Sequence, residues 1–237
     1  MVVEPDLKQR IEILARWMFE AKHLVIFTGA GISTESGLPD FRGPDGLWTR
    51  QAKGLPSPEF DWSQAKPSPS HLAIVGLQNL GKLAFLITQN VDNLHLASGI
   101  RPELLAELHG NVFKLRCRGC GFKCDAFPDL KTCPECGGEL ASSVVNFGDP
   151  LPLQELRLAE EHSQRADLFI VVGSSLVVYP AAEMPEIAAR SGARLVIINQ
   201  GNVPAEFEHR CHLRFRERVG EVLPPAVARL KELMGRA

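Results

Sequence analysis

Short apolar runs alternate with segments of helical periodicity along most of the chain. The apolar runs occupy residues 24–27, 83–87, 168–172 and 195–198. Nearly continuous runs of this length are typical of strands in a parallel sheet whose two faces are both covered. Apolar residues recur at helical spacing before each run, at residues 5–22, 71–80, 153–163 and 181–191. The pattern predicts an α/β fold, an open parallel sheet with helices on both faces and right-handed crossovers.

Residues 217–237 predict a closing helix that is interrupted or started at Pro224 and Pro225. Two other segments do not fit the alternation. Residues 44–70 contain five prolines and predict a long loop with little regular structure. Residues 114–145 hold clustered cysteines and lack apolar runs long enough for the main sheet.

We interpret residues 44–70 and 114–145 as insertions that build a small lobe within a single domain of residues 1–237. The remaining segments, about 5–43, 71–113 and 146–237, then form a Rossmann-like large lobe. Ligands of such folds bind at the carboxyl ends of the strands. A cleft between the two lobes is therefore the expected site.

Composition and charge limit the classes of protein. The chain is 45% hydrophobic and 23% charged, which is ordinary for a soluble globular protein. A formal net charge of −2 provides no global attraction to nucleic acid or to an anionic membrane. The apolar runs are too short to cross a bilayer, and the N-terminal MVVEPDLKQRIEIL lacks a signal-peptide core. We therefore expect a cytoplasmic protein without a membrane or nucleic-acid partner.

The cysteines predict a metal site. Four of the six form two C-x-x-C pairs separated by twelve residues: Cys117 with Cys120, and Cys133 with Cys136. Four thiolates on two tight turns are the ligands that tetrahedral zinc requires, and they leave no open coordination position. The zinc is therefore expected to be structural; the alternative is a set of buried thiols without metal. Cys124 is a possible competing ligand that the paired spacing disfavours, and the isolated Cys211 is expected to pack in the interior.

The sequence GAGISTESGLPDFRG, residues 29–43, directly follows the first apolar run. Gly29 and Gly31 allow the backbone to approach a pyrophosphate, and Arg42 after such a loop is expected to face phosphate. The dinucleotide fingerprint lacks its last glycine, so the loop alone leaves nucleotide binding and a simple chain turn equally open. The loop also contains hydroxyl residues that could be helix caps: Ser33, Thr34 and Ser36.

Polar residues also follow the other three apolar runs. Asn90 and Asp92 follow the second run and could either reach into the cleft together or cap the next helix. Residues 173–175 (GSS) follow the third run, and residues 199–201 (NQG) follow the fourth. Four such tips at one edge of a sheet indicate a ligand-binding rim. Of the seven histidines, His95 and His109 lie at plausible active-site positions, and the residues alone do not choose between them.

Taken together, these motifs resemble the sirtuins, NAD-dependent protein lysine deacylases. The shared motifs are GAGIS, PDFRG, TQNVD-x-LH, LHG, the two C-x-x-C pairs, VVNFGDPLP, GSSL and IN, in the family's order over roughly residues 8–232. FRGPDGLWT and the compact segment 49–70 most resemble the branch of the mammalian chromatin-associated sirtuin known for deacylation and mono-ADP-ribosylation. The zinc segment is shorter and closer to the bacterial and archaeal form.

The resemblance implies that NAD is bound and consumed, and that acyl-lysine peptides or proteins are the substrates. It implies His109 as the catalytic base, with Asn90 and Asp92 where the glycosidic bond to nicotinamide breaks. The other implied cofactor contacts are Gly29, Ala30, Gly31, Thr34, Phe41, Arg42, Trp48, Gln89, Gly173, Ser174, Ser175, Asn199, Gln200 and Val219. The peptide is expected between two strands that contain Val145, Asn146, Phe147, Gly148, Val177, Val178 and Tyr179.

The implied reaction transfers the acyl group of lysine to ADP-ribose and releases nicotinamide, with His109 removing a proton through the ribose hydroxyls. The succinyl- and malonyl-lysine branch uses a Tyr-x-x-Arg pair, whereas the one tyrosine of this chain, Tyr179, lies elsewhere. Neutral acyl groups are therefore expected. The alternatives are mono-ADP-ribosyl transfer to protein at the same NAD site and a non-enzymatic zinc-ribbon module. We expect a monomer.

Overall fold

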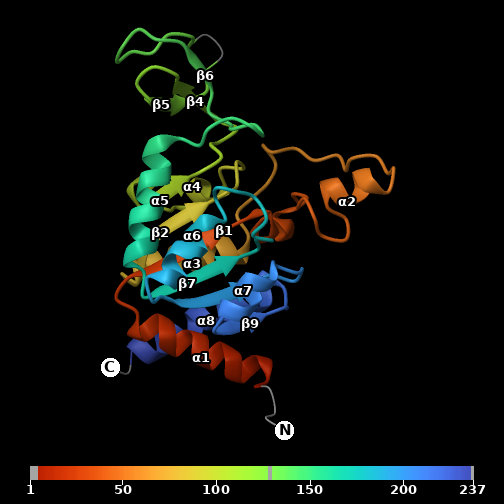
Figure 1. Ribbon diagram of the computed structural model, residues 1–237, viewed down its shortest axis with the longest axis vertical. Coiled ribbons are helices and arrows are strands. Elements are labelled where there is room, and N and C mark those ends of the chain that lie inside the picture. The colour runs from red at the N-terminus through yellow and green to blue at the C-terminus, as the bar shows by residue number, and fades with distance from the viewer. Residues whose placement is uncertain (1–4, 128–129, 236–237) are drawn as a thin grey trace.

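The large sheet has six parallel strands in the order β3-β2-β1-β7-β8-β9 (Figure 1). The computed structural model describes residues 5–127 and 130–235. The strands are β1 (Leu24–Thr28), β2 (Leu83–Thr88), β3 (Leu105–Glu107), β7 (Leu168–Val172), β8 (Arg194–Ile198) and β9 (Leu213–Phe215). The four apolar runs of the sequence are the four central strands, and β1 and β7 are buried along their whole length. The predicted open parallel sheet is confirmed.

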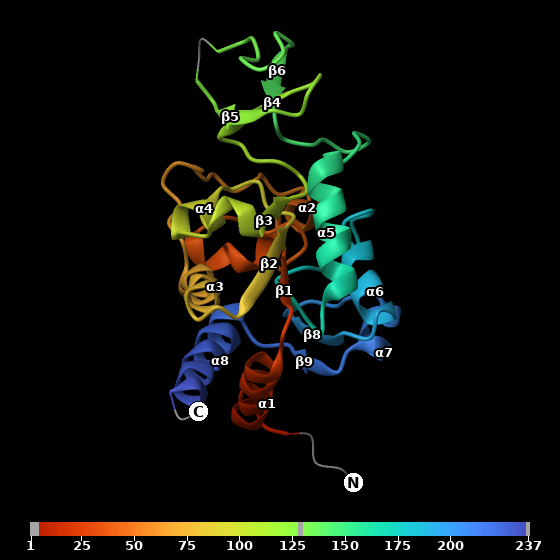
Figure 2. The same cartoon turned by 90° about the vertical axis from the view of Figure 1, so that its left-hand side faces the viewer.

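Helices cover both faces of this sheet (Figure 2). One face packs against α1 (Leu7–Glu20), α3 (Pro69–Asn79) and α8 (Val219–Met234). The other packs against α5 (Leu153–Arg165), α6 (Glu183–Arg190) and α7 (Ala205–Arg210). Each large aliphatic side chain buried in these layers contributes roughly 1.5–3 kcal/mol to folding. This two-faced burial explains why the strand sequences are apolar at successive positions.

The closing helix differs from its prediction. α8 begins at Val219 and continues through Pro224 and Pro225 without a break. The two prolines remove two backbone donors, but α8 also buries a stripe of apolar side chains against α1 and α3. This packing holds the helix through both residues. The last two residues of the predicted helix, 236 and 237, lie outside the described part of the chain.

A second, three-stranded antiparallel sheet lies apart from the first, at the top of Figure 1. It consists of β4 (Lys114–Cys117), β5 (Lys123–Asp125) and β6 (Leu140–Ser142). The segment expected to be an irregular loop contains the short helix α2 (Leu47–Ala52), which projects to the right in Figure 1. Within the described residues, no helix is both long and apolar enough to cross a membrane.

The strand order reverses beside β1. The chain passes from β1 outward through β2 and β3 on one side, and through β7, β8 and β9 on the other. In an open parallel sheet, ligands bind at the carboxyl ends of the strands that flank this reversal. The loops after β1 and β7 meet there: the Gly31 amide donates to the Gly173 carbonyl oxygen at 2.9 Å. The topology therefore predicts that a ligand binds at this edge of the sheet.

Candidate active site

The glycines of the two central loops bring those loops into contact. A Cβ atom on Gly29 would lie 2.8 Å from the Gly173 carbonyl oxygen, and one on Gly31 would lie 2.8 Å from Gly173 Cα. Gly173 itself has a φ of 63°, which glycine adopts without strain. The amides of Gly29 and Gly31 donate to the carbonyls of Val172 and Gly173. These glycines thus join the two loops, and the expected approach of their backbone to a pyrophosphate stays a prediction.

Arg42 lies over the rim that the two loops form. Its guanidinium is 4.1 Å from the centre of the Trp48 ring, and its Nη1 donates to Ser175 Oγ at 3.4 Å. Partial burial lowers the Arg42 pKa from its usual value, yet an arginine stays charged at neutral pH. The ring of Phe41 packs 5.0 Å from that of Trp48. The structure thus brings together four of the predicted cofactor residues, with one positive charge that suits phosphate.

Asn90, Asp92 and Ser33 form a buried polar cluster behind this rim. The Ser33 hydroxyl donates to Asp92 Oδ2 at 2.6 Å, and the Asn90 amide donates to Ser33 Oγ and to the Gly29 carbonyl, each at 3.2 Å. Burial raises the Asp92 pKa, and the hydrogen bonds that it accepts oppose the shift. Asp92 Oδ1 also accepts the Leu94 amide at 2.9 Å, at the start of α4 (Leu94–Ser98). Asp92 therefore accepts a bond from the first turn of α4, and its expected contact with a ligand in the cleft stays a prediction.

Ser33 has a partner that the sequence did not reveal. A helix cap was one possible role, but its side chain makes no capping bond to the short 3₁₀ turn Thr34–Ser36. Its hydroxyl instead faces the Asp92 carboxylate and is 2% exposed. Its place directly after GAGI, on the first loop of the rim, was the available signal. Thr34, a predicted cofactor contact, is exposed and donates to the Gly31 carbonyl at 3.0 Å.

The structure distinguishes the two candidate histidines. His109 Nδ1 lies 2.9 Å from the Gln89 carbonyl oxygen, at the carboxyl end of β2. A carbonyl can only accept, so Nδ1 carries the proton and Nε2 keeps its lone pair. Burial lowers the His109 pKa, which favours this neutral form, while the bond to Gln89 opposes the shift. His109 is therefore neutral and oriented, as a general base must be.

His95, by contrast, belongs to the core. It is 3% exposed, its Nε2 lies 2.9 Å from Thr28 Oγ1, and its ring packs 4.9 Å from that of His71. Burial lowers the pKa of His95 far below its usual value, and the charge of a protonated His71 acts in the same direction. A histidine that stays neutral inside the core is a packing residue. Of the two candidates, His109 alone lies at the rim.

The segments expected to hold the peptide are extended or turn segments. They were predicted as two strands, but neither Val145–Gly148 nor Val177–Tyr179 belongs to a sheet. No strand of the described chain pairs with either segment, and strand assignment requires such pairing. Their large side chains are exposed: Phe147 by 79%, Tyr179 by 52% and Val177 by 43%. Phe147 also packs 5.7 Å from Trp48, and the Val145 amide donates to the His109 carbonyl.

The far end of the rim is formed by the loop after β8 and the start of α8. Asn199 follows β8 and donates to the Gly201 carbonyl at 3.0 Å, whereas Gln200 is exposed. Val219 begins α8 and is 7% exposed. Glu35, to which the sequence assigned no role, accepts the Gly220 amide at 3.2 Å and so connects the first loop to α8. Gln89 donates to Ser174 Oγ at 2.8 Å between the second and third strand tips.

The four paired cysteines meet in the small lobe. All four Sγ atoms lie within 4.8 Å of one another, with 3.5 Å between Cys117 and Cys136 and 3.6 Å between Cys120 and Cys133. Zinc–sulfur bonds of about 2.3 Å in tetrahedral geometry require sulfur–sulfur separations of about 3.8 Å. The cluster therefore fits one structural zinc ion. Cys124 is not part of the cluster, as the paired spacing of the other four cysteines predicted. Cys211 is partly buried against backbone carbonyls.

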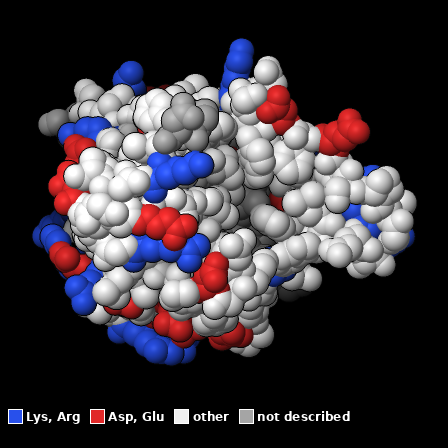
Figure 3. Space-filling view, turned by 90° about the horizontal axis from the view of Figure 1, so that it is seen from above, with Lys and Arg blue, Asp and Glu red and all other residues white. Residues whose placement is uncertain are grey.

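Seen from above, the surface has a recess between the main body and the α2 segment, which projects to the right in Figure 3. Positive and negative side chains are interspersed on this face.

An open parallel sheet with a polar rim where the strand order reverses is typical of nucleotide-binding enzymes, and this one carries a separate four-cysteine lobe. The Sir2 family model matches residues 29–60 and 57–180. The chain belongs to the Sir2 family.

Relatives agree with this assignment. The chain is 41% identical to "NAD-dependent protein deacetylase 1" of Bradyrhizobium diazoefficiens, over 95% of this chain and 98% of the relative. It is 44% identical to "NAD-dependent protein deacetylase SRT1" of Oryza sativa subsp. indica over 84% of this chain, but spans only 44% of that longer protein. A solved structure described as Sir2 with p53 peptide and NAD+ superposes with a TM-score of 0.73 at 36% identity, covering 96% of this chain and 99% of the other.

Proposed function

We propose that this protein is an NAD-dependent protein lysine deacylase that transfers the acyl group of lysine to ADP-ribose and releases nicotinamide. The observation that carries the proposal is the 2.9 Å distance between His109 Nδ1 and the Gln89 carbonyl oxygen, because that contact requires the proton on Nδ1 and leaves Nε2 as the base. The buried Asn90 and Asp92 follow Gln89 at the end of β2. A base and a buried carboxylate at one strand end suit proton removal and glycosidic bond cleavage.

The residues at the rim fit NAD. Arg42 supplies positive charge for the phosphates, and the hydroxyls of Ser174 and Ser175 lie on the loop that it meets. NAD, when bound, supplies the ribose carbon that accepts the acyl oxygen, with nicotinamide as the leaving group. Asp92 and Asn90 orient the nicotinamide end through the cluster that includes Ser33. Asn199, Gln200 and Val219 bind the adenosine end, and Phe41 and Trp48 exclude water from the reacting groups.

His109 accepts a proton at Nε2, and its bond to Gln89 holds the ring in one orientation for this step. The zinc ion does not take part in the reaction, because four thiolates leave no open position on the metal. It stabilises the lobe that faces the cleft.

An acyl-lysine peptide binds along Val145–Gly148 and Val177–Tyr179. The support is that these segments expose apolar side chains and lie outside any sheet, so that a peptide strand can pair with their backbone. Val145 is bonded to the His109 carbonyl, which sets this segment against the base. Neutral acyl chains are the expected cargo, because Tyr179 is the only tyrosine and lies in this segment.

The test uses NAD labelled in its ADP-ribose part, together with acetyl, butyryl, myristoyl and succinyl lysine peptides, analysed by mass spectrometry. The proposal predicts labelled O-acyl-ADP-ribose with neutral acyl peptides, and loss of turnover in H109A while calorimetric NAD binding is kept. Label retained on protein would instead indicate mono-ADP-ribosyl transfer. Failure to bind NAD would indicate a non-enzymatic zinc module.

Finer assignments stay predictions. The FRGPDGLWT motif supports membership in the branch of the mammalian chromatin-associated deacylase and mono-ADP-ribosyltransferase sirtuin. The predicted single domain, residues 1–237 with its two lobes, would unfold in one calorimetric transition. We also propose that the protein is cytoplasmic and monomeric and has no nucleic-acid partner. Cell fractionation tests the location, light scattering tests the monomeric state, and filter binding tests for nucleic-acid binding.

A further inference from the structure

Asn111 is a fully buried polar residue close to the proposed base, and the mechanism above gives it no role. Its side-chain nitrogen donates to Asn93 Oδ1 at 2.8 Å and to Glu107 Oε1 at 2.7 Å. Its side-chain oxygen accepts the Phe113 amide at 2.9 Å. Both amide protons and the oxygen are therefore engaged, and a flipped amide would set its oxygen against the Glu107 carboxyl group. The network has one favourable arrangement.

One end of this network holds the turn that carries Asp92. Asn93 directly follows Asp92 and has a φ of 66°, one of two positive-φ non-glycine residues among those described. A left-handed conformation at such a residue costs of order 1 kcal/mol or more and needs support from its surroundings. The bond from Asn111 supplies that support. Asn93 directly precedes α4, and Glu107 ends β3. In Figure 2 both of these elements lie at the top of the large sheet, below the small one.

The other end holds the turn that carries His109. Gly110, between His109 and Asn111, has a φ of 78°, and a Cβ atom there would overlap the Ser143 carbonyl oxygen. The Ser143 hydroxyl donates to the Asn111 carbonyl at 2.8 Å and accepts the Asn111 amide at 3.0 Å. The backbone that follows His109 is therefore held against Ser143 at Gly110 and Asn111.

Glu107 completes the network at the boundary with the small lobe. Glu107 and Glu155 are each 7% exposed, and the Glu107 amide donates to Glu155 Oε2 at 3.2 Å. Burial raises the pKa of Glu107, and the charge of Glu155 acts in the same direction. The charges of Lys123 and Lys114 oppose the shift, and Lys123 pairs directly with Glu155. Positive charge from the small lobe thus compensates the two buried carboxyl groups.

We propose that Asn111 is a positioning residue that joins the Asp92–Asn93 turn to the His109 turn, so that the groups acting on the two halves of the reaction keep one fixed separation. The proposal rests on the proposed function, because it takes His109 and Asp92 as the acting groups. It assigns Asn93 as the acceptor through which Asn111 reaches Asp92.

The sharpest test is N93G. Glycine adopts the left-handed backbone of position 93 without strain, so this variant keeps the conformation of the turn while it loses the acceptor for Asn111. We expect the deacetylation kcat to fall about tenfold, the loss expected for one hydrogen bond of about 1.4 kcal/mol, with the KM for NAD within about twofold of the parent. A purely structural role would make activity follow the unfolding midpoint. Parental kcat in N93G would overturn the proposal.

A second set of variants tests the Glu107 side. N111D replaces both donors by an oxygen and is expected to lose more activity than N93G. E107Q/N111D restores the hydrogen bond with donor and acceptor exchanged and with the parental net charge, and it is expected to recover most of that loss. N79D, at an exposed asparagine at the end of α3, is the matched control and is expected to keep parental kcat. Lack of recovery in a folded E107Q/N111D would contradict the role of the Asn111–Glu107 bond.

H109A and D92N, measured in parallel, separate this inference from the function on which it rests. If both retain parental turnover, the proposed function fails, whatever N93G does. If both lose turnover and N93G does not, only the positioning role of Asn111 is wrong.

Discussion

The Nδ1 atom of His109 lies 2.9 Å from the carbonyl oxygen of Gln89. Because the carbonyl requires a proton on Nδ1, the second nitrogen of the ring is unprotonated whenever the ring is neutral. The bond also holds the ring at the carboxyl end of β2, the strand whose tip carries Asn90 and Asp92. One backbone oxygen thus sets both the tautomer and the place of the proposed base.

The pH dependence of kcat/KM follows from this geometry. Burial holds the His109 pKa below its usual 6.5, and the active form is the neutral ring. We therefore expect kcat/KM to be level near pH 7 to 8 and to fall as the pH drops below 6.5, where the base becomes protonated. Initial rates with an acetyl-lysine peptide between pH 5 and 8.5 measure this. An acidic limb centred above pH 7 would contradict the assignment.

Removal of the Ser33 hydroxyl should slow nicotinamide release. Ser33 donates a 2.6 Å bond to Asp92, and a buried carboxylate that loses a donor is destabilised by about 1–3 kcal/mol. We expect S33A to lower the rate of peptide-dependent nicotinamide release by about tenfold or more. S36A is the matched control: Ser36 Oγ is buried and has no hydrogen-bond partner among the described residues, so its removal should change little. Equal rates for S33A and S36A would exclude this role for Ser33.

Loss of one zinc ligand should unfold the small lobe. C133S removes a buried thiolate from the four-cysteine cluster, and structural zinc sites contribute directly to folding. We expect less than one zinc per chain, a lower unfolding midpoint and rapid proteolysis within residues 114–145. C124S, outside the cluster, should keep full zinc content. Zinc loss in C124S, or full retention in C133S, would show that the ligand set is wrong.

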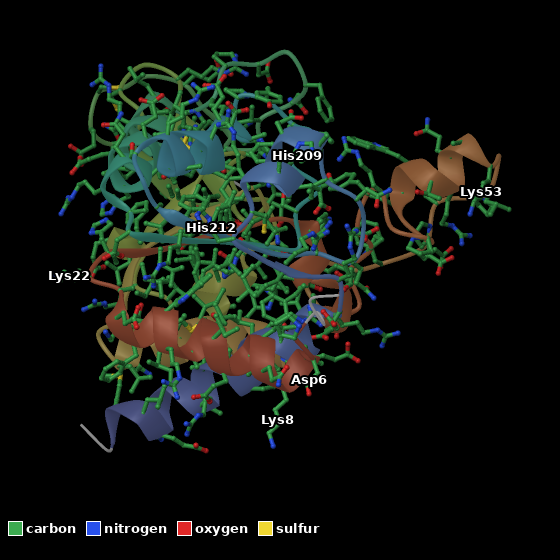
Figure 4. All side chains as sticks on the ribbon, turned by 60° about the horizontal axis from the view of Figure 1, so that its bottom comes forward. Asp6, Lys8, Lys22, Lys53, His209 and His212 are labelled. Carbon is green, nitrogen blue, oxygen red and sulfur yellow. The ribbon has the colours of Figure 1, made fainter. Side chains whose placement is uncertain are left out.

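The buried histidines predict acid lability. Burial lowers the His71 pKa to about 4, whereas the unfolded chain titrates near 6.5, so the unfolded state binds more protons between these values. Stability is therefore fully present above pH 6.5 and is lost as the pH falls toward 4, by about 3 kcal/mol at most. H71N should flatten this slope in urea unfolding between pH 7 and 5. H209N, at an exposed histidine of α7 labelled in Figure 4, should leave it unchanged, and an unaltered slope in H71N would contradict the account.

The sequence predicted the parts of the fold that depend on local pattern. The sequence predicted β1, β2, β7 and β8, because strands that are buried on both faces of a sheet consist of continuous apolar residues. The edge strands β3 and β9 were missed, since each has three residues and too short a run to show a period. α8 was misjudged at Pro224, because packing of its apolar stripe outweighs two lost backbone bonds.

The site shows the same limit. The cysteine spacing alone predicted the cluster, since two short turns determine where the sulfur atoms lie. The sequence could not predict residues whose role depends on a partner far away along the chain. Ser33 contacts Asp92, 59 positions later, and Gly29 lies against Gly173 in the loop of another strand. The choice of His109 over His95 likewise required the structure, because only burial and the Gln89 carbonyl distinguish them.

The most direct test of the central claim is mass spectrometry of the products formed from NAD and an acetyl-lysine peptide by the parent and by H109A. The account predicts that the parent forms nicotinamide, free lysine peptide and O-acetyl-ADP-ribose in equal amounts, and only when the peptide is acetylated. It predicts that H109A forms less than about a hundredth of the O-acetyl-ADP-ribose, as expected for loss of a general base. Parental amounts of O-acetyl-ADP-ribose from H109A would contradict the account.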